Sequence, residues 1–268
     1  MEAEQLSGRL NGRVAIVTGS TSGIGWGIAR ALARSGSAVM LNGFGDPATV
    51  EALRLGLENE FKVPVRHHGA DVADPQAVEA MVVAAVAEFG GLDILVNNAG
   101  LQHVAKLTEF PLERWERIIA VNLSGVFYGM RYALPVMEER GWGRIVNIAS
   151  AHGLVASGSK VAYVAAKHGV VGATKVAAIE AAASGVTVNA ICPGWVLTPL
   201  VARQLEERAE AAGTSIEEAK RQMLAETQPL SRFTTPEQVG ELTVFLCGPQ
   251  AATITGAALP IDGGWVAH

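Results

Sequence analysis

The chain has 268 residues, of which 49% are hydrophobic and 18% charged, which excludes a disordered chain and supplies enough apolar material for a core. The 21 Lys and Arg residues against 26 Asp and Glu leave a net charge of -5. There is no basic excess to neutralise a phosphate backbone, so nucleic acid is not an expected partner.

The two cysteines, Cys192 and Cys247, match neither a C-x-x-C motif nor a Cys/His ligand spacing. We expect free thiols and a reducing compartment, and no cluster of Cys, His and Asp at ligand spacing indicates a catalytic metal. The segment 1–11 is polar, and no stretch approaches the roughly 18 apolar residues of a membrane span. We therefore expect a cytoplasmic location, no membrane partner and a flexible segment at 1–11.

Short apolar strands alternate with helices along the chain. The expected elements in order are a strand at 14–18, a helix at 26–35, a strand at 38–41, a helix at 47–60, a strand at 63–70, a helix at 75–89, a strand at 94–96, a long helix at 112–140, a strand at 144–148, a helix at 161–183 and a strand at 186–191. Apolar strands separated by helices are typical of a parallel sheet covered on both faces. We expect an α/β, Rossmann-like, doubly wound parallel sheet of about seven strands, with residues 1–268 as one domain.

The segment 199–228 departs from this alternation. It is rich in charged and amide side chains and lies between Pro199 and Pro229. One interpretation is a solvated helical hairpin without a function. The other, favoured by its place in the chain, is a mobile lid, because ligand sites lie beyond the carboxyl ends of parallel strands.

Gly19, Gly23 and Gly25 lie between the first expected strand and the first helix, with the spacing G-x-x-x-G-x-G. Glycines there allow a tight turn and bring backbone N–H groups and a helix N-terminus close to a pyrophosphate. A glycine-rich turn without a ligand is the alternative.

Tyr163 and Lys167 are four residues apart and fall on one helix face. An ammonium beside a phenol stabilises the phenolate and lowers the tyrosine pKa, which makes a general base. Ser150 follows an expected strand, so its hydroxyl would meet Tyr163 at the carboxyl edge of the sheet.

These motifs occur in the order found in the short-chain dehydrogenase/reductase family, which the chain resembles over nearly its whole length. The resemblance implies that Ser150 binds the substrate oxygen, Tyr163 removes its proton, Lys167 lowers the Tyr163 pKa and binds the nicotinamide ribose, and Asn122 holds a proton-relaying water. It also implies that Asp71 bonds the adenine amino group. The cofactor-binding residues that it implies are Gly19, Thr21, Gly23, Ile24, Gly25, Phe44, Asp71, Val72, Asn98, Ala99, Gly100, Tyr163, Lys167, Pro193, Gly194, Val196 and Thr198.

The second expected strand decides the choice of cofactor. A carboxylate for the adenosine ribose is missing there, since the strand ends Leu41-Asn-Gly-Phe-Gly45 with Asp46 only nearby. No Lys or Arg occurs at 35–53 or in the glycine loop to bind a 2′-phosphate. NAD is therefore favoured over NADP.

Four hydrogen-bond donors occur where the family places substrate contacts: Gln102, His152, Lys160 and Gln204. Together they fit a small carboxylate. With Trp195 and Trp265, they resemble the branch of the family that oxidises (R)-3-hydroxybutyrate. The resemblance implies that the six side chains bind this acid beside Ser150 and Tyr163, in a homotetramer.

Two rival interpretations stay open. One is an NADPH-dependent reductase of the same family, acting on a 3-oxoacyl carrier or a sugar, but the chain lacks basic residues for the cofactor phosphate. The other is an inactive, dinucleotide-binding regulatory module, against which the intact catalytic residues argue.

Overall fold

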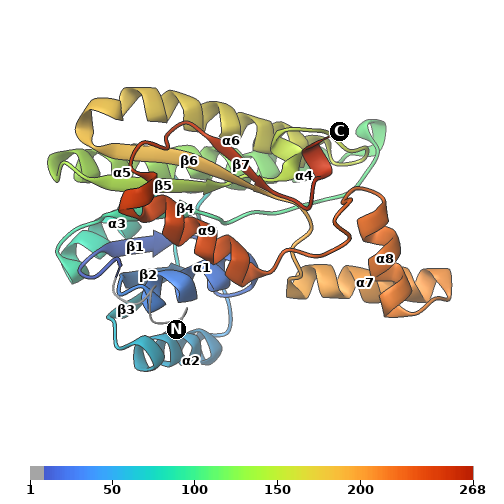
Figure 1. Ribbon diagram of the computed structural model, residues 1–268, viewed down its shortest axis with the longest axis horizontal. Coiled ribbons are helices and arrows are strands. Elements are labelled where there is room, and N and C mark those ends of the chain that lie inside the picture. The colour runs from blue at the N-terminus through green and yellow to red at the C-terminus, as the bar shows by residue number, and fades with distance from the viewer. Residues whose placement is uncertain (1–8, 268) are drawn as a thin grey trace.

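The computed structural model describes residues 9–267 (Figure 1). Its strands are β1 (Val14–Val17), β2 (Ala38–Asn42), β3 (Val65–His68), β4 (Ile94–Asn97), β5 (Gly143–Ile148), β6 (Val186–Pro193) and β7 (Ala258–Ile261). Its α-helices are α1 (Gly23–Arg34), α2 (Pro47–Phe61), α3 (Pro75–Phe89), α4 (Leu112–Ile119), α5 (Gly125–Glu139), α6 (Val161–Glu180), α7 (Pro199–Ala212), α8 (Ile216–Ala225) and α9 (Pro236–Cys247). The expected alternation of strands and helices is confirmed.

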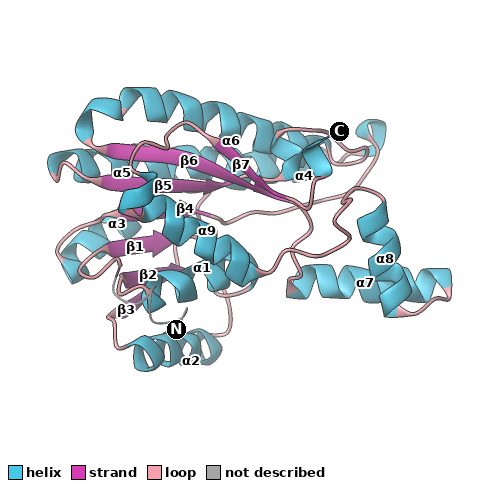
Figure 2. Cartoon of the chain, in the orientation of Figure 1, coloured by secondary structure: helices cyan, strands magenta, loops and turns pink. Residues whose placement is uncertain are grey.

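The seven strands form one parallel sheet in the order β3-β2-β1-β4-β5-β6-β7, with helices on both faces (Figure 2). The expected doubly wound fold is thus confirmed. The order reverses between β1 and β4, and in open α/β sheets ligands bind at such a point. The fold therefore places a site at the carboxyl ends of these strands.

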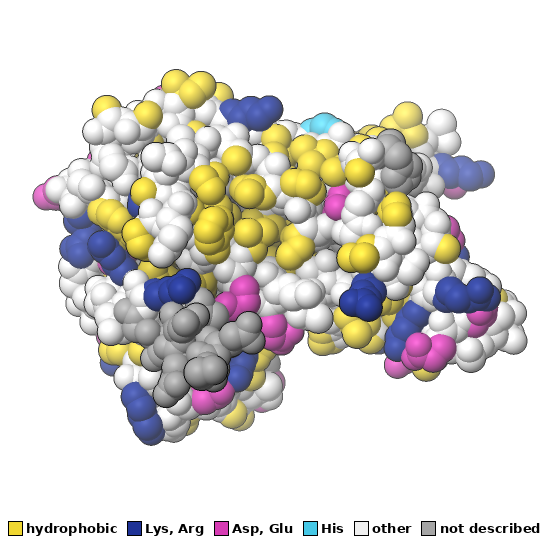
Figure 3. All heavy atoms as spheres, in the orientation of Figure 1, with side chains coloured by type: hydrophobic (Ala, Val, Ile, Leu, Met, Phe, Trp, Pro, Cys, Tyr) yellow, Lys and Arg dark blue, Asp and Glu magenta, His cyan; other side chains and the backbone are white. Residues whose placement is uncertain are grey.

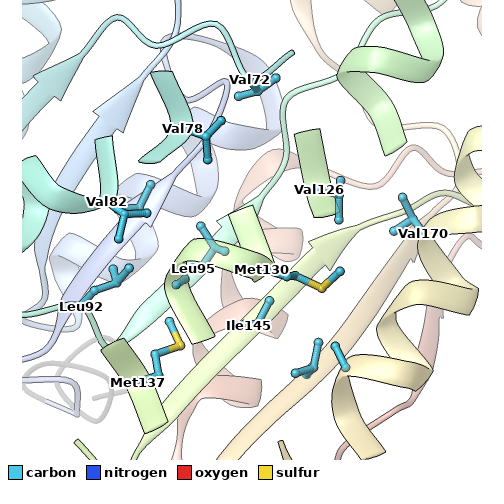
Figure 4. Packing of buried hydrophobic residues seen from close by; sticks show 14 of the residues in the cluster. Val72, Val78, Val82, Leu92, Leu95, Val126, Met130, Met137, Ile145 and Val170 are labelled. Atoms are coloured by element: carbon cyan, nitrogen blue, oxygen red, sulfur yellow. The ribbon is translucent and has the colours of Figure 1, made fainter. Parts of the chain in front are cut away.

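Each face of the sheet carries its own hydrophobic core, because successive side chains of a strand point to opposite faces. In β1, Ile16 packs into the core shared with α3, α5 and α6, whereas Ala15 and Val17 pack against α1 and α9. Figure 4 shows part of the first core, where Leu95 and Ile145 of the sheet meet Met130 and Met137 of α5. The sheet edge that carries the site is therefore held rigidly from both sides.

The expected flexible segment 1–11 lies mostly outside the described residues, since the description begins at residue 9. Leu10 is buried, and its backbone N–H donates to Ser35 O. The residues just before β1 are thus packed against the end of α1.

The single helix expected at 112–140 is wrong in one respect. A π-helical stretch, Ala120–Ser124, separates α4 from α5. Such stretches take up an extra residue within a helix and occur frequently at functional sites. Hydrophobic periodicity did not show it, since the residues on both sides are helix formers.

The segment 199–228 forms two helices, α7 and α8, joined at Gly213. Val201, Leu205 and Met223 form a small core between them, which Trp195 covers. Figure 1 shows both helices beyond the carboxyl edge of the sheet, and Figure 3 shows charged side chains gathered over them at the lower right. The pair is amphipathic, and part of it borders the cavity described next.

Candidate active site

A cavity of about 460 Å³ opens at the carboxyl edge of the sheet. Loops after six of the strands and the start of α7 supply its walls. The expected cofactor and catalytic residues on its walls are Gly19, Thr21, Gly23, Ile24, Phe44, Asp71, Val72, Asn98, Ala99, Gly100, Ser150, Tyr163, Lys167, Pro193, Gly194 and Thr198. Three other expected residues, Gly25, Asn122 and Val196, lie behind this surface.

Two positions of the glycine loop, Gly19 and Gly25, have no room for a side chain. A Cβ at Gly25 would lie 2.3 Å from Gly19 O, and one at Gly19 would lie 2.9 Å from Ala99 Cα. Ser22 and Gly23 line the cavity where α1 begins, and no side chain caps that helix. Unpaired N–H groups at a helix start favour an anion, so the loop fits the diphosphate of a dinucleotide.

Asn42 at the end of β2 ties three strand ends together. Its Oδ1 accepts from Gly19 N at 3.2 Å, and its Nδ2 donates to His68 O and Ala70 O, both at 2.9 Å. Phe44 follows it and is 65% exposed on the cavity wall. Sequence reasoning noted the missing carboxylate here but missed the positioning role of this amide.

Asp71 carries an ion pair that the sequence did not predict. Arg117 Nη2 of α4 donates to both carboxylate oxygens, at 3.2 and 3.0 Å, and Ala73 N donates to Oδ1 at 3.0 Å. Both side chains line the cavity. The carboxylate is thus fixed in orientation, and its charge is balanced at the expected adenine end.

Asn98 holds the loop after β4 against the glycine loop. Its Nδ2 donates to Thr18 O at 2.8 Å and to Gly19 O at 3.0 Å, and its N–H donates to Thr18 Oγ1 at 2.9 Å. Because the Asn98 side chain binds backbone carbonyls, its role is to hold the two loops that form this part of the cavity wall.

Asn122 lies in the π-helical stretch and is fully buried. Its Nδ2 donates to Leu101 O at 2.9 Å and its Oδ1 accepts from Leu101 N at 2.8 Å. The expected water-holding role is not tested by these contacts. They show that Asn122 fixes the loop that follows Gly100.

Ser150, Tyr163 and Lys167 come together at the end of β5 and the start of α6. Lys167 Nζ donates to Ile148 O at 2.7 Å and lies 5.6 Å from the centroid of the Tyr163 ring. Ser150 lies close enough to Tyr163 to affect the pKa of the phenol, and its Oγ accepts from His152 N at 3.1 Å. The expected serine, tyrosine and lysine are therefore adjacent on the cavity wall.

The pKa values of this group differ from the simplest expectation. Burial raises the pKa of Tyr163, and the hydrogen bond to Ser150 opposes the shift only in part. Burial also lowers the pKa of Lys167 to about 8. The protein alone therefore disfavours both charged forms, because desolvation outweighs the effect of Ser150 on Tyr163 and that of Cys192 on Lys167.

The expected substrate residues include a compact aromatic cluster next to Tyr163. The His152 ring lies 4.9 Å from that of Trp265 and 5.9 Å from that of Tyr163, centroid to centroid. Trp195 stacks on Trp265 at 6.0 Å, and Lys160 Nζ lies 5.1 Å from the Trp195 ring centroid. Loops after β5, β6 and β7 bring these side chains together.

Burial controls the charges within the aromatic cluster. It lowers the pKa of His152 to about 4, with a contribution from the Lys160 charge, and it also lowers the pKa of Lys160. His152 Nε2 lies 2.7 Å from Ser157 Oγ. His152 is therefore neutral near pH 7, and Lys160 supplies the positive charge.

The two glutamines expected to bind substrate, Gln102 and Gln204, lie outside the aromatic cluster. Gln102 is exposed on the cavity wall, whereas Gln204 is half-buried on α7 away from it. Arg203, one residue earlier, lines the cavity instead. The four expected donors are thus not all gathered around one point.

Gln228 is another positioning residue that the sequence reasoning missed. It is buried, its Oε1 accepts from Trp195 N at 2.6 Å, and its Nε2 donates to Arg232 O at 2.8 Å. A Cβ at Gly194 would lie 2.5 Å from the same Oε1. The side-chain amide of Gln228 therefore joins the loop at Trp195 to the loop at Arg232 and fixes the position of Trp195.

The thiols of Cys192 and Cys247 are free and buried, as expected. Burial raises their pKa values to about 11 and about 12, so both stay protonated. Within residues 9–267, no group of three or more His, Cys, Asp and Glu side chains has a metal-binding arrangement, and no helix has the length and apolarity to cross a membrane.

Known proteins resemble this chain throughout its length. The family model described as Enoyl-(Acyl carrier protein) reductase matches residues 19–266. The D-beta-hydroxybutyrate dehydrogenase of Cupriavidus necator is 55% identical over 97% of this chain and 100% of its own. The D-beta-hydroxybutyrate dehydrogenase of Rhizobium meliloti is 51% identical over 96% and 99%.

Solved structures share the fold as well. A single-substitution variant of actinorhodin polyketide ketoreductase with NADPH superposes with a TM-score of 0.89 at 39% identity, covering 98% of this chain and 100% of that one. L-sorbose reductase from Gluconobacter frateurii, complexed with NADPH and L-sorbose, has a TM-score of 0.93 at 30% identity, covering 98% and 99%.

Proposed function

Because the chain belongs to the short-chain dehydrogenase/reductase family of oxidoreductases, we propose that it transfers a hydride reversibly from (R)-3-hydroxybutyrate to NAD, giving acetoacetate and NADH. The observation that carries this choice of substrate is the cluster of Lys160, His152, Trp195 and Trp265 beside Tyr163. It combines one half-buried cation with an apolar wall, which suits a short acid. The (R)-3-hydroxy acid is the D-beta-hydroxybutyrate of the relatives' names.

The protein's own groups handle the proton. Ser150 donates a hydrogen bond to the substrate oxygen, and the Tyr163 phenolate accepts the hydroxyl proton. Burial raises the Tyr163 pKa, so the phenolate needs nearby positive charge to form. Lys167 supplies it, since Ile148 O holds its Nζ close to the Tyr163 ring.

The acid end of the substrate binds on the far side of Tyr163. Lys160 gives the carboxylate a charge-assisted hydrogen bond, and neutral His152 donates another. Gln102 adds a neutral donor from the cavity wall, and Gln204, which lies on α7 away from the cavity in this structure, joins the set when the lid closes. The stacked Trp195 and Trp265 rings limit the room for longer chains.

The cavity residues fit a dinucleotide. The unpaired N–H groups at the start of α1 would hold the diphosphate, and Asp71 would hold the adenine. Lys167 would bind the nicotinamide ribose. When bound, the oxidised nicotinamide accepts the hydride and adds positive charge near Tyr163.

NAD is preferred over NADP in this proposal. Phe44 stands on the cavity wall after β2, and residues 35–53 contain no Lys or Arg for a 2′-phosphate. Arg117, the cation at the adenine end, is already paired with Asp71.

The structure also supports the expected domain organisation, lid, oligomeric state and location of the protein. Residues 1–268 act as one catalytic domain, and 199–228 act as a lid, because Pro199 and Leu200 border the cavity. Exposed apolar side chains on α5 and α6, such as Phe127 and Ile179, support a homotetramer. The two buried free thiols suit the cytoplasm.

The direct test is a substrate panel read as NADH formed from NAD. Purified protein should oxidise (R)-3-hydroxybutyrate and reject the (S) enantiomer, because hydride and proton acceptors lie on fixed sides of the carbon. Turnover of uncharged alcohols alone would contradict the proposed substrate.

A second candidate is an NADPH-dependent reductase of a different ketone. It is favoured by the two similar solved structures that hold NADPH. The same panel, run in reverse with acetoacetate and with NADPH against NADH, separates the two functions.

A further inference from the structure

The cationic side chains that line the cavity differ in whether they already have a partner within the protein. Among the described residues, those that line it are Arg117, Lys167 and Arg203. Arg117 is paired with Asp71, and Lys167 Nζ is bound to Ile148 O. In the part of the chain that the structure describes, the side chain of Arg203 makes no hydrogen bond or ion pair.

Arg203 reaches the cavity from the lid segment. Pro199, Leu200 and Arg203 all line it, and the spacing of Pro199 and Arg203 puts them on one face of α7. The start of α7 also lies close to the glycine loop, since a Cβ built on Gly23 would lie 3.4 Å from Thr198 Cγ2. Arg203 therefore stands one helical turn from the place where the loop and the lid meet.

The glycine loop leaves a charge unbalanced when a dinucleotide binds. A diphosphate carries about two negative charges, and residues 19–25 contain no Lys or Arg. The helix start supplies only about half a positive charge. A guanidinium, which can donate two parallel hydrogen bonds to phosphate oxygens, suits the remaining charge.

We propose that Arg203 binds the diphosphate of the dinucleotide, so that α7 contacts the cofactor through Arg203 before the next residue, Gln204, reaches the substrate. This inference rests on the proposed binding of a dinucleotide. It adds a function for the lid, because cofactor binding then draws α7 onto the cavity before the hydroxy acid enters.

The test compares ligands with and without a diphosphate. Calorimetry measures the Kd of NAD, ADP-ribose and adenosine for the wild type and for Arg203→Ala. The variant should bind NAD and ADP-ribose about tenfold more weakly, the loss of one exposed charge-assisted contact, and adenosine about equally well. The difference in Kd between the wild type and Arg203→Ala should shrink at high salt, because the contact is electrostatic.

Two further variants exclude indirect effects. Arg203→Lys keeps the charge and should recover part of the affinity. Arg221→Ala removes the same charge from α8, where the side chain is 76% exposed and pairs with Glu218, and should leave every Kd unchanged. Hydrogen exchange gives a second readout, since ADP-ribose should slow exchange in α7 of the wild type but not of Arg203→Ala.

The contradicting results are distinct. Equal weakening of adenosine and ADP-ribose would make Arg203 a structural residue, and an unchanged Kd with a higher KM for the hydroxy acid would assign it to the substrate. Either outcome overturns the inference and leaves the proposed function standing. Normal NAD binding without oxidation of (R)-3-hydroxybutyrate would overturn the function and leave the inference intact.

Discussion

The ammonium of Lys160 lies 5.1 Å from the ring centroid of Trp195, on the indole that stacks against Trp265. Burial lowers the pKa of Lys160, so this cation is held where solvation is incomplete. An anion that enters beside it replaces missing water with a direct ion pair. The proposed specificity for a carboxylate would follow from the positive charge of Lys160, which the aromatic rings alone cannot balance.

Replacing Lys160 should therefore separate acids from neutral alcohols. Lys160→Ala should lower kcat/KM for (R)-3-hydroxybutyrate by about 10- to 150-fold, the value of one charge-assisted hydrogen bond, and affect 2-butanol much less. Lys175→Ala removes the same charge from the exposed side of α6 and serves as the control. An equal loss for both substrates would mean that Lys160 supports the Tyr163 helix instead.

The same cation gives the reaction a pH dependence. Because burial lowers the Lys160 pKa below 10.5, its charge is lost as pH rises through that lowered value. KM for the acid should therefore rise in alkaline solution, at a pH below the ordinary lysine range. Initial rates against pH measure this, and Lys160→Arg should move the rise to higher pH. A KM that stays flat up to pH 10.5 would contradict the assignment.

Tyr163→Phe should abolish most turnover while leaving cofactor affinity within a few-fold. The substitution removes the proton acceptor but keeps the ring beside Lys167 and His152. General acid–base groups contribute about 10²- to 10⁴-fold, so kcat should fall by that factor. Steady-state rates and the Kd of NAD are the two measurements. A variant with most of its activity left would exclude Tyr163 as the base.

Protonation of His152 should destabilise the fold in mild acid. Its pKa is about 4 in the folded chain, against 6.5 for the ordinary value, so the unfolded chain binds this proton first as pH falls. The stability is fully present above pH 6.5 and is lost between 6.5 and 4. Between about pH 7 and about pH 5 the loss should be about 2 kcal/mol.

Urea unfolding at the two pH values measures this loss, at one protein concentration. His152→Gln removes the titrating group and should show a smaller loss than the wild type. Equal losses in both proteins would show that His152 takes up its proton in the folded state.

Phe44 should limit the use of NADP. Wild-type kcat/KM should favour NAD strongly, since the cavity wall after β2 offers no cation to a 2′-phosphate. Phe44→Arg places a guanidinium there and should improve NADP by about tenfold or more, while Phe44→Leu should not. Rates with both cofactors decide it. Equal use of both by the wild type would contradict the cofactor assignment.

Sequence reasoning reached the parts of the site that local pattern controls. The glycine spacing, the Tyr163–Lys167 pair and the strand alternation each depend on a few consecutive residues. It missed the contacts made between distant segments. Arg117 meets Asp71 across 46 positions, and Gln228 fixes Trp195 across 33. Such pairs leave no periodicity, since one arginine in a polar helix or one glutamine in a loop looks like any solvated residue.

The π-helical stretch Ala120–Ser124 also sets the rotational phase between α4 and α5. An extra residue in a helix turns everything after it by roughly 100°. Arg117 can thus face the cavity on one side while Met130 and Met137 face the sheet core on the other. A one-residue deletion here would rotate one of these faces out of place, so the length of this stretch constrains the chain more tightly than the identity of most of its side chains.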